Sequence, residues 1–148
     1  MHAPITTLAA AFLVAATTAL GLAAPAAAQD SNAARWLVTE RLSSVCETGE
    51  GMFDLQGIIE RDLTGDGRDD LILFDDYVTC SGTAFRPTTC EFGECEFNVY
   101  VREGALLQPK LTDRTVARLD VLTGEPPVIV YAQRDGVRSV RWNGSLFR

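Results

Sequence analysis

The sequence predicts an α+β fold that is mainly β, with an N-terminal helix packed on an antiparallel meander sheet of about six or seven strands. Three observations predict it. Apolar residues recur at helical spacing between residues 31 and 46, apolar and polar residues alternate from residue 96 onward, and turn dipeptides separate the runs of the second half.

The helix is predicted over residues 31–46. Asp30 and Ser31 are candidate N-caps, because their side-chain oxygens can accept from the free N–H groups of the first turn. The positions that give the helical spacing are Ala34, Val38, Leu42, Val45 and Cys46. This spacing indicates an amphipathic helix with one face on the sheet.

Strands are predicted from two kinds of pattern. Residues 55–60 and 71–74 are short apolar runs, and the second is apolar at every position, which is typical of a central strand covered on both faces. After residue 96, Phe97, Val99 and Val101 alternate with polar residues. Further strands are expected near 117–121 and 128–132, with turns at 103–104, 135–136 and 143–144. The second half is therefore expected to be a meander.

The first 28 residues are typical of a cleavable signal peptide. Residues 5–28 carry no charged side chain and end in Pro25 followed by small residues, which predicts cleavage after Ala28. A transmembrane anchor is the alternative, but Gly21 interrupts the stretch and no basic flank follows it. We therefore expect a periplasmic or secreted protein with one domain, residues 29–148, and no stable membrane insertion after cleavage.

The net charge limits the partners of this domain. The chain has a formal net charge of -7, and residues 1–28 contribute none of it. Nucleic acids and anionic membranes are bound through Lys and Arg clusters, so the acidic balance argues against both. A cation or a basic partner fits better.

Four cysteines, Cys46, Cys80, Cys90 and Cys95, predict two disulfides in an exported chain. Three connectivities are possible. Cys90 and Cys95 bracket a Gly-containing turn and can bridge locally, which leaves Cys46 to pair with Cys80. A zinc site built from the four thiolates is the alternative, but no C-x-x-C pair is present.

The segment 62–70 (DLTGDGRDD) carries the strongest chemical pattern. Oxygen-bearing side chains occur at Asp62, Thr64, Asp66 and Asp70, and the Arg68 carbonyl completes the alternating series by which a tight loop wraps a hard cation. Gly67 permits the sharp reversal that such a loop requires. The pattern predicts calcium as a cofactor, with water or a distant residue completing the coordination.

This segment resembles the calcium loop of VCBS and FG-GAP type repeats, in which an aspartate-rich segment lies between two strands of a β-propeller blade. The resemblance covers residues 58–75. It implies that the residues matching Asp62, Thr64, Asp66 and Asp70 give side-chain oxygens and that Arg68 gives its carbonyl. Thr64 stands where Asp or Asn is usual, and one copy is present where a propeller has many. The resemblance therefore implies a calcium-stabilised strand pair without the propeller.

Two other interpretations of the segment remain. EF-hand and dockerin loops need an acidic twelfth position and an exiting helix, whereas here the twelfth residue is Leu73 in a predicted strand. A metal-free Asx turn is the simpler alternative. Against it, like charges about 4 Å apart repel by about 4 kcal/mol at an effective dielectric constant of about 20, so a loop that gathers carboxylates favours a cation.

Catalytic residues are scarce. The only histidine, His2, is lost with the signal peptide, and paired cysteines supply no thiolate. Carboxylates cluster at Glu91, Glu94 and Glu96 and at Asp75 and Asp76, which we interpret as a solvated rim. Most of the aromatic side chains are expected in the core, and the irregular segment 81–95 is the first place to look for a recognition surface.

These patterns favour an exported, calcium-stabilised domain that binds a protein or a glycan. A small carboxylate-dependent hydrolase is the alternative, and an inhibitor of a basic enzyme is a third possibility that rests on size, charge and export.

Overall fold

The computed structural model describes residues 31–116 and 118–148. The predicted signal peptide and the candidate cap Asp30 lie outside the described residues. The described part contains one α-helix and ten strands, all paired antiparallel, which confirms the α+β, mainly β fold class. No helix of this part is long and apolar enough to cross a bilayer.

The helix α1 (Asn32–Val45) begins at the predicted cap. The Ser31 hydroxyl oxygen accepts from the Ala34 N–H at 3.1 Å, which satisfies one free donor of the first turn. Ala34 and Val45 are buried, and the exposed fraction of Trp36 is 62%. The helix thus packs one face on the sheet, as the spacing predicts.

A central sheet carries the order β2-β3-β6-β5, with β7 also paired to β6. The bounds are β2 (Ile58–Arg61), β3 (Asp70–Phe74), β5 (Cys90–Glu91), β6 (Glu94–Glu103) and β7 (Leu106–Thr115). Every residue of β3 is buried, which confirms residues 71–74 as a central strand covered on both faces. The predicted strand at 55–60 starts later, because the Asp54 side chain accepts from the Gln56 N–H and closes a short 3-10 turn, η1 (Leu55–Gly57).

Two smaller sheets complete the fold. One pairs β1 (Gly51–Phe53) with β4 (Val78–Cys80), which follows the 3-10 turn η2 (Asp75–Tyr77), and the other has the order β10-β9-β8. The latter contains β8 (Leu119–Leu122), β9 (Val128–Gln133) and β10 (Gly136–Arg141). The tight turn before β10 is formed by Arg134 and Asp135, one residue earlier than predicted.

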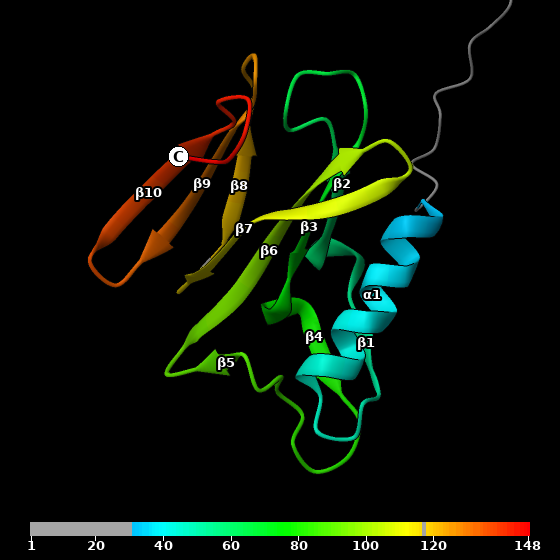
Figure 1. Cartoon of the computed structure of the whole chain (residues 1–148). Coiled ribbons are helices and arrows are strands. Elements are labelled where there is room, and N and C mark those ends of the chain that lie inside the picture. Colours follow the sequence, from blue (N-terminus) through cyan, green and yellow to red (C-terminus); the bar gives the residue numbers. More distant parts are fainter. Residues whose placement is uncertain (1–30, 117) are drawn as a thin grey trace, which may run out of the picture.

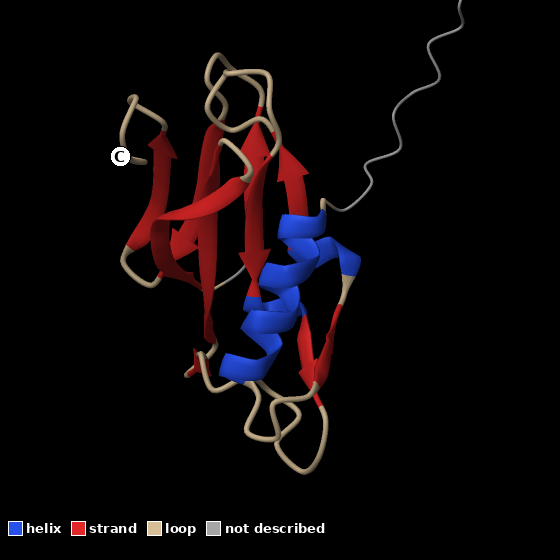
Figure 2. Ribbon diagram, turned by 45° about the vertical axis from the view of Figure 1, so that its right-hand side comes forward, coloured by secondary structure: helices blue, strands red, loops and turns tan. Residues whose placement is uncertain are grey.

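The elements form three layers, with α1 on one side of the central sheet and the β8–β10 sheet on the other (Figures 1 and 2). One core cluster joins Ile72, Phe97 and Val99 to residues of the β8–β10 sheet, and the second joins Leu71 and Leu73 to α1. The alternation in β6 therefore faces its apolar residues toward the β8–β10 sheet.

Both predicted disulfides are present. Cys46 pairs with Cys80 and joins the end of α1 to β4, while Cys90 pairs with Cys95 across the β5–β6 hairpin. No free cysteine occurs among the described residues. The four sulfurs are therefore not available as zinc-binding thiolates.

Candidate functional site

The aspartate loop joins the edge strand β2 to the central strand β3. Arg61 and Asp70 are directly paired at its base, and Leu63, which is fully buried, anchors the loop in the core between the two large sheets. The loop is thus fixed to the fold at one end of the central sheet. Its predicted donors lie along one short, anchored turn.

Asp62 organises the first half of the loop. Its Oδ1 accepts backbone N–H groups of Thr64 at 3.0 Å and Gly65 at 2.6 Å, and its Oδ2 accepts that of Gly67 at 2.7 Å. Both glycines have positive φ, 82° and 81°, a conformation that favours glycine. Burial opposes ionisation, but these hydrogen bonds outweigh it and lower the pKa of Asp62.

Asp66 is turned toward Arg68. Its Oδ1 accepts the Arg68 backbone N–H at 2.9 Å, and its Oδ2 lies 2.6 Å from the Arg68 guanidinium. These two bonds to Arg68, side chain first, lower the pKa of Asp66. The charge of Asp66, a predicted ligand, is therefore neutralised within the loop by Arg68.

Asp70 is fully buried and ties the loop to the sheet. Its Oδ2 accepts the Leu63 N–H at 2.9 Å, and its Oδ1 accepts the N–H of Arg102 in β6 at 2.8 Å. Burial raises the pKa of Asp70; the two N–H donors oppose the rise, and the charges of Asp66 and Asp62 add to it. The negative potential of the loop thus reaches its buried end.

The donor set fits a hard cation in chemistry, because carboxylates, a hydroxyl and a carbonyl are the oxygen ligands that calcium prefers. The Thr64 hydroxyl lies 3.4 Å from Asp62 Oδ1. Among the described residues, the group of His, Cys, Asp and Glu ligand atoms within 4.8 Å of one another is Asp76 with Cys90 and Cys95, whose sulfurs are bridged. Convergence of the loop carboxylates on an ion therefore requires Asp66 to turn away from Arg68.

Glu125 is a neighbouring carboxylate that no sequence pattern indicates. It lines a cavity of about 460 Å³ together with Asp62, Thr64 and Gly65, in the segment that connects β8 to β9. A second cavity, of about 240 Å³, is lined by other residues of the loop together with Arg102 and Trp142. Glu125 lies too far along the chain for any local spacing to have indicated it.

The carboxylates of the hydrolase alternative are held in ion pairs. Glu91 lies 4.0 Å from Arg114, Glu94 lies 3.3 Å from Arg134, and Glu96 lies 2.6 Å from Arg41. The Arg41 guanidinium also contacts fully buried Asp75. Burial disfavours the charged guanidinium, but its bonds to Asp75 and Glu96 outweigh this and raise the pKa of Arg41. These ion pairs connect β6 to α1, β5 to β7, and β6 to the β9–β10 turn.

The segment 81–95 displays exposed aromatic residues. The exposed fractions of Phe85 and Phe92 are 67% and 89%, so these two residues and Trp36 are exceptions to the expected aromatic core. Phe92 has a positive φ of 51° and lies under the Arg134 guanidinium, 5.9 Å from the ring centroid. The side chain is therefore held outward at the tip of the disulfide-bonded β5–β6 hairpin.

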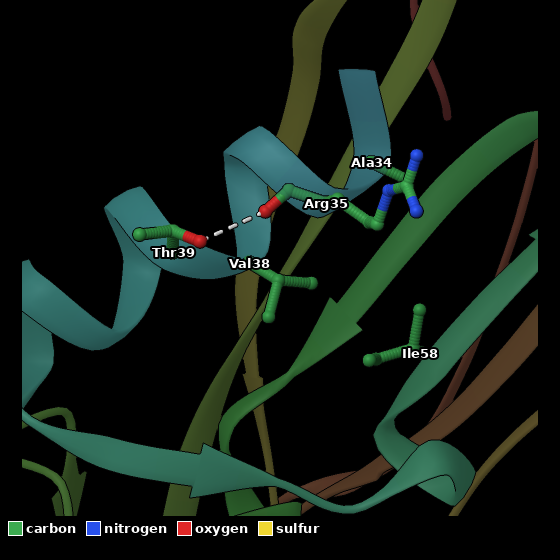
Figure 3. Close-up of a pocket in the computed structure, with 5 residues that line it drawn as sticks. All are labelled: Ala34, Arg35, Val38, Thr39 and Ile58. Carbon is green, nitrogen blue, oxygen red and sulfur yellow. Dashed lines mark hydrogen bonds between the residues drawn. The ribbon is translucent and has the colours of Figure 1, made fainter. Parts of the chain in front are cut away.

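A pocket of about 250 Å³ lies between α1 and the edge strand β2 (Figure 3). Its lining residues are Ala34, Arg35, Val38, Thr39 and Ile58. The Thr39 hydroxyl donates to the Arg35 carbonyl at 3.0 Å, and the Arg35 guanidinium donates to the Asn32 side chain. The pocket is thus apolar, and its polar groups are engaged within the helix.

Comparisons of the chain with protein-family models, with curated proteins and with solved structures found no match.

Proposed function

We propose that the chain is an exported, disulfide-bonded binding domain that calcium stabilises at residues 62–70. The two disulfides suit an oxidising, extracytoplasmic compartment, and the first 28 residues have the composition of a signal peptide. The loop is a single copy of the VCBS and FG-GAP type in this proposal. Its role is to fix the end of the central sheet, and the partner is a protein or a glycan.

The observation that carries the proposal is the alternation of oxygen donors in a loop that ends on a buried carboxylate. Asp62, Thr64 and Asp66 precede the chain reversal, and the Arg68 carbonyl and Asp70 follow it. An ion held by these groups would connect the end of β2 to the start of β3. Since Asp70 also accepts from β6, the ion would stabilise three strands together.

The charge of the loop favours a divalent ion but limits its affinity. The segment 62–70 contains four carboxylates, including that of Asp69, and one cationic side chain, that of Arg68. Calcium must displace Arg68 from Asp66, which costs part of the binding free energy. We therefore expect a dissociation constant on the order of 0.1 to 1 mM, as in other extracellular modules.

The proposal is tested by thermal unfolding and isothermal titration of the exported protein, first stripped with a chelator. Calcium at about ten times its dissociation constant should stabilise the fold by about 1.4 kcal/mol and raise Tm by about 5 °C. Magnesium should have a smaller effect, because it dehydrates reluctantly and demands octahedral geometry. The absence of both heat and a Tm shift at millimolar calcium would overturn the calcium site.

Two variants of neighbouring aspartates give a matched comparison. Asp66→Ala removes a proposed ligand oxygen from an exposed position, whereas Asp69→Ala removes an equal charge beside the ligand series. Calcium stabilisation should be lost in Asp66→Ala and kept in Asp69→Ala. Equal loss in both would show that calcium responds only to the charge of the loop.

A binding role is better supported than the hydrolase alternative. Glu91, Glu94 and Glu96 have different arginine partners, whereas hydrophobic residues are displayed at Phe85 and Phe92. Aromatic side chains, Phe among them, are enriched in protein interfaces relative to the rest of the surface. The proposed function therefore assigns these carboxylates to the fold and the exposed surfaces to recognition.

A further inference from the structure

The strand β10 is an open edge of the molecule. It pairs with β9 on one side and lies at the opposite side of the fold from α1 (Figures 1 and 2). Five of its six residues are exposed, and the exposed fraction of Val137 is 74%. Open edges present unpaired N–H and C=O groups and are templates for a further strand.

The pairing register shows which backbone groups point outward. Gln133 and Gly136 are directly paired at the tight β9–β10 turn. The backbone N–H and C=O groups of the even-numbered residues of β10 therefore bond to β9, and those of the odd-numbered residues point away from β9. Arg141 agrees with this pattern, because it bonds to Arg148 on the outer side at 3.0 and 3.1 Å. No hydrogen bond to the outward groups of Val137 and Ser139 occurs within the described residues.

This edge belongs to the basic part of an acidic protein. Residues 118–148 contain five arginines and three carboxylates, a net charge of +2. Since the whole chain has a net charge of -7, the other residues together have a net charge of -9. Three of the arginines, Arg138, Arg141 and Arg148, belong to β10 or to the terminal segment beside it. Arg138 pairs with Asp135 at 2.9 Å, but the net positive charge of this part still favours an acidic chain here over the rest of the molecule.

We propose that the outer edge of β10 docks an acidic, extended peptide segment of a partner, which adds a fourth strand to the β8–β10 sheet. Val137 and Ser139 offer two N–H donors and two C=O acceptors at the two-residue spacing of an extended chain. A glycan lacks that backbone repeat. This proposal rests on the proposed binding function and names the class of partner. It does not depend on the calcium loop, so the β10 docking site and the calcium site can each be refuted separately.

Fluorescence anisotropy with short labelled peptides tests the proposal. The probes are an alternating Glu-Val peptide, a Lys-Val peptide of the same length, and a Glu-Val peptide N-methylated at alternate residues on its pairing edge. Only the first should bind, and its affinity should fall as salt increases. No binding of the first, or equal binding of the N-methylated probe, would overturn the proposal. Equal competition by dextran sulfate would point to anion binding without strand pairing and also overturn it.

A pair of substitutions at Ser139 tests the same edge from the protein side. Ser139→Pro removes an outward N–H that β9 does not use, and Ser139→Ala keeps it. The proline variant should lose about tenfold in affinity, corresponding to the loss of about one hydrogen bond, while the alanine variant binds normally. Unchanged binding by a folded Ser139→Pro variant would contradict edge pairing; if that variant does not fold, the N-methylated probe decides.

Discussion

The backbone N–H of Arg102 donates to the buried Oδ1 of Asp70 at 2.8 Å, so a carboxylate at the end of the aspartate loop holds the strand β6 of the central sheet. The other oxygen of Asp70 accepts the Leu63 N–H. Asp70 therefore serves the fold before any ion binds. Its structural role and its proposed metal-binding role are separable by experiments with and without chelator.

Asp70→Ala should destabilise the chelated protein by about 2 to 4 kcal/mol, because the N–H groups of Leu63 and Arg102 lose their buried acceptor. Urea denaturation monitored by tryptophan fluorescence measures the loss. Asp69→Ala is the control: its side chain is exposed, and its change should stay within about 0.5 kcal/mol. Equal effects of the two substitutions would contradict the role assigned to Asp70.

Asp62 should make the fold sensitive to acid. Its pKa is lowered in the folded protein, so its ionised form contributes stability above the unfolded value of about 3.8 and that contribution is lost as the pH falls through the folded pKa. Asp62→Asn in chelator should therefore show a smaller loss of stability below about pH 4 than the native chain. Urea midpoints measured from neutral to acid pH test this, and parallel pH profiles of the two proteins would refute it.

Arg41 should be essential for stability, because its loss leaves Asp75 as a buried charge without its cationic partner. Arg41→Ala is expected to cost about 3 to 5 kcal/mol. Arg35→Ala, on the exposed part of the same helix, is the matched control and should change the free energy of unfolding by less than about 0.5 kcal/mol. Recovery of stability in the double variant Arg41→Met with Asp75→Leu would support the explanation, since it removes both charges.

The elements with strong periodicity were predictable from the sequence. The buried run at 71–74, the alternation in β6 and the capped helix each depend on residues close together in the chain. The pairing of Cys90 with Cys95 is equally local. These features are set by backbone geometry and burial, which short patterns report directly.

Contacts between distant elements were not predictable in the same way. Arg41 meets Asp75 and Glu96, which lie 34 and 55 residues further along the chain, and no spacing rule connects them. The net charge of the whole chain likewise concealed the basic β8–β10 sheet. In the aspartate loop, the donor types and an Asx turn were evident from the sequence, and Asp62 does accept the Thr64 N–H. That Asp62 also accepts the N–H groups of Gly65 and Gly67 depends on the folded turn.

The two disulfides should differ in their contribution to stability, because they close loops of different length. Cys46 and Cys80 are separated by 34 residues, and Cys90 and Cys95 by 5. Restriction of the unfolded chain predicts about 4 kcal/mol for the long bridge and about 2 kcal/mol for the short one.

Paired serine substitutions test this difference under non-reducing conditions, with the free energy of unfolding measured in urea. Cys46→Ser with Cys80→Ser should lower it by about twice as much as Cys90→Ser with Cys95→Ser. The long bridge also fixes the end of α1 to β4, so its loss should expose the core beneath the helix, whereas loss of the short bridge should affect the β5–β6 hairpin. A larger loss from the short bridge would show that native packing, rather than chain restriction, determines what each bridge contributes.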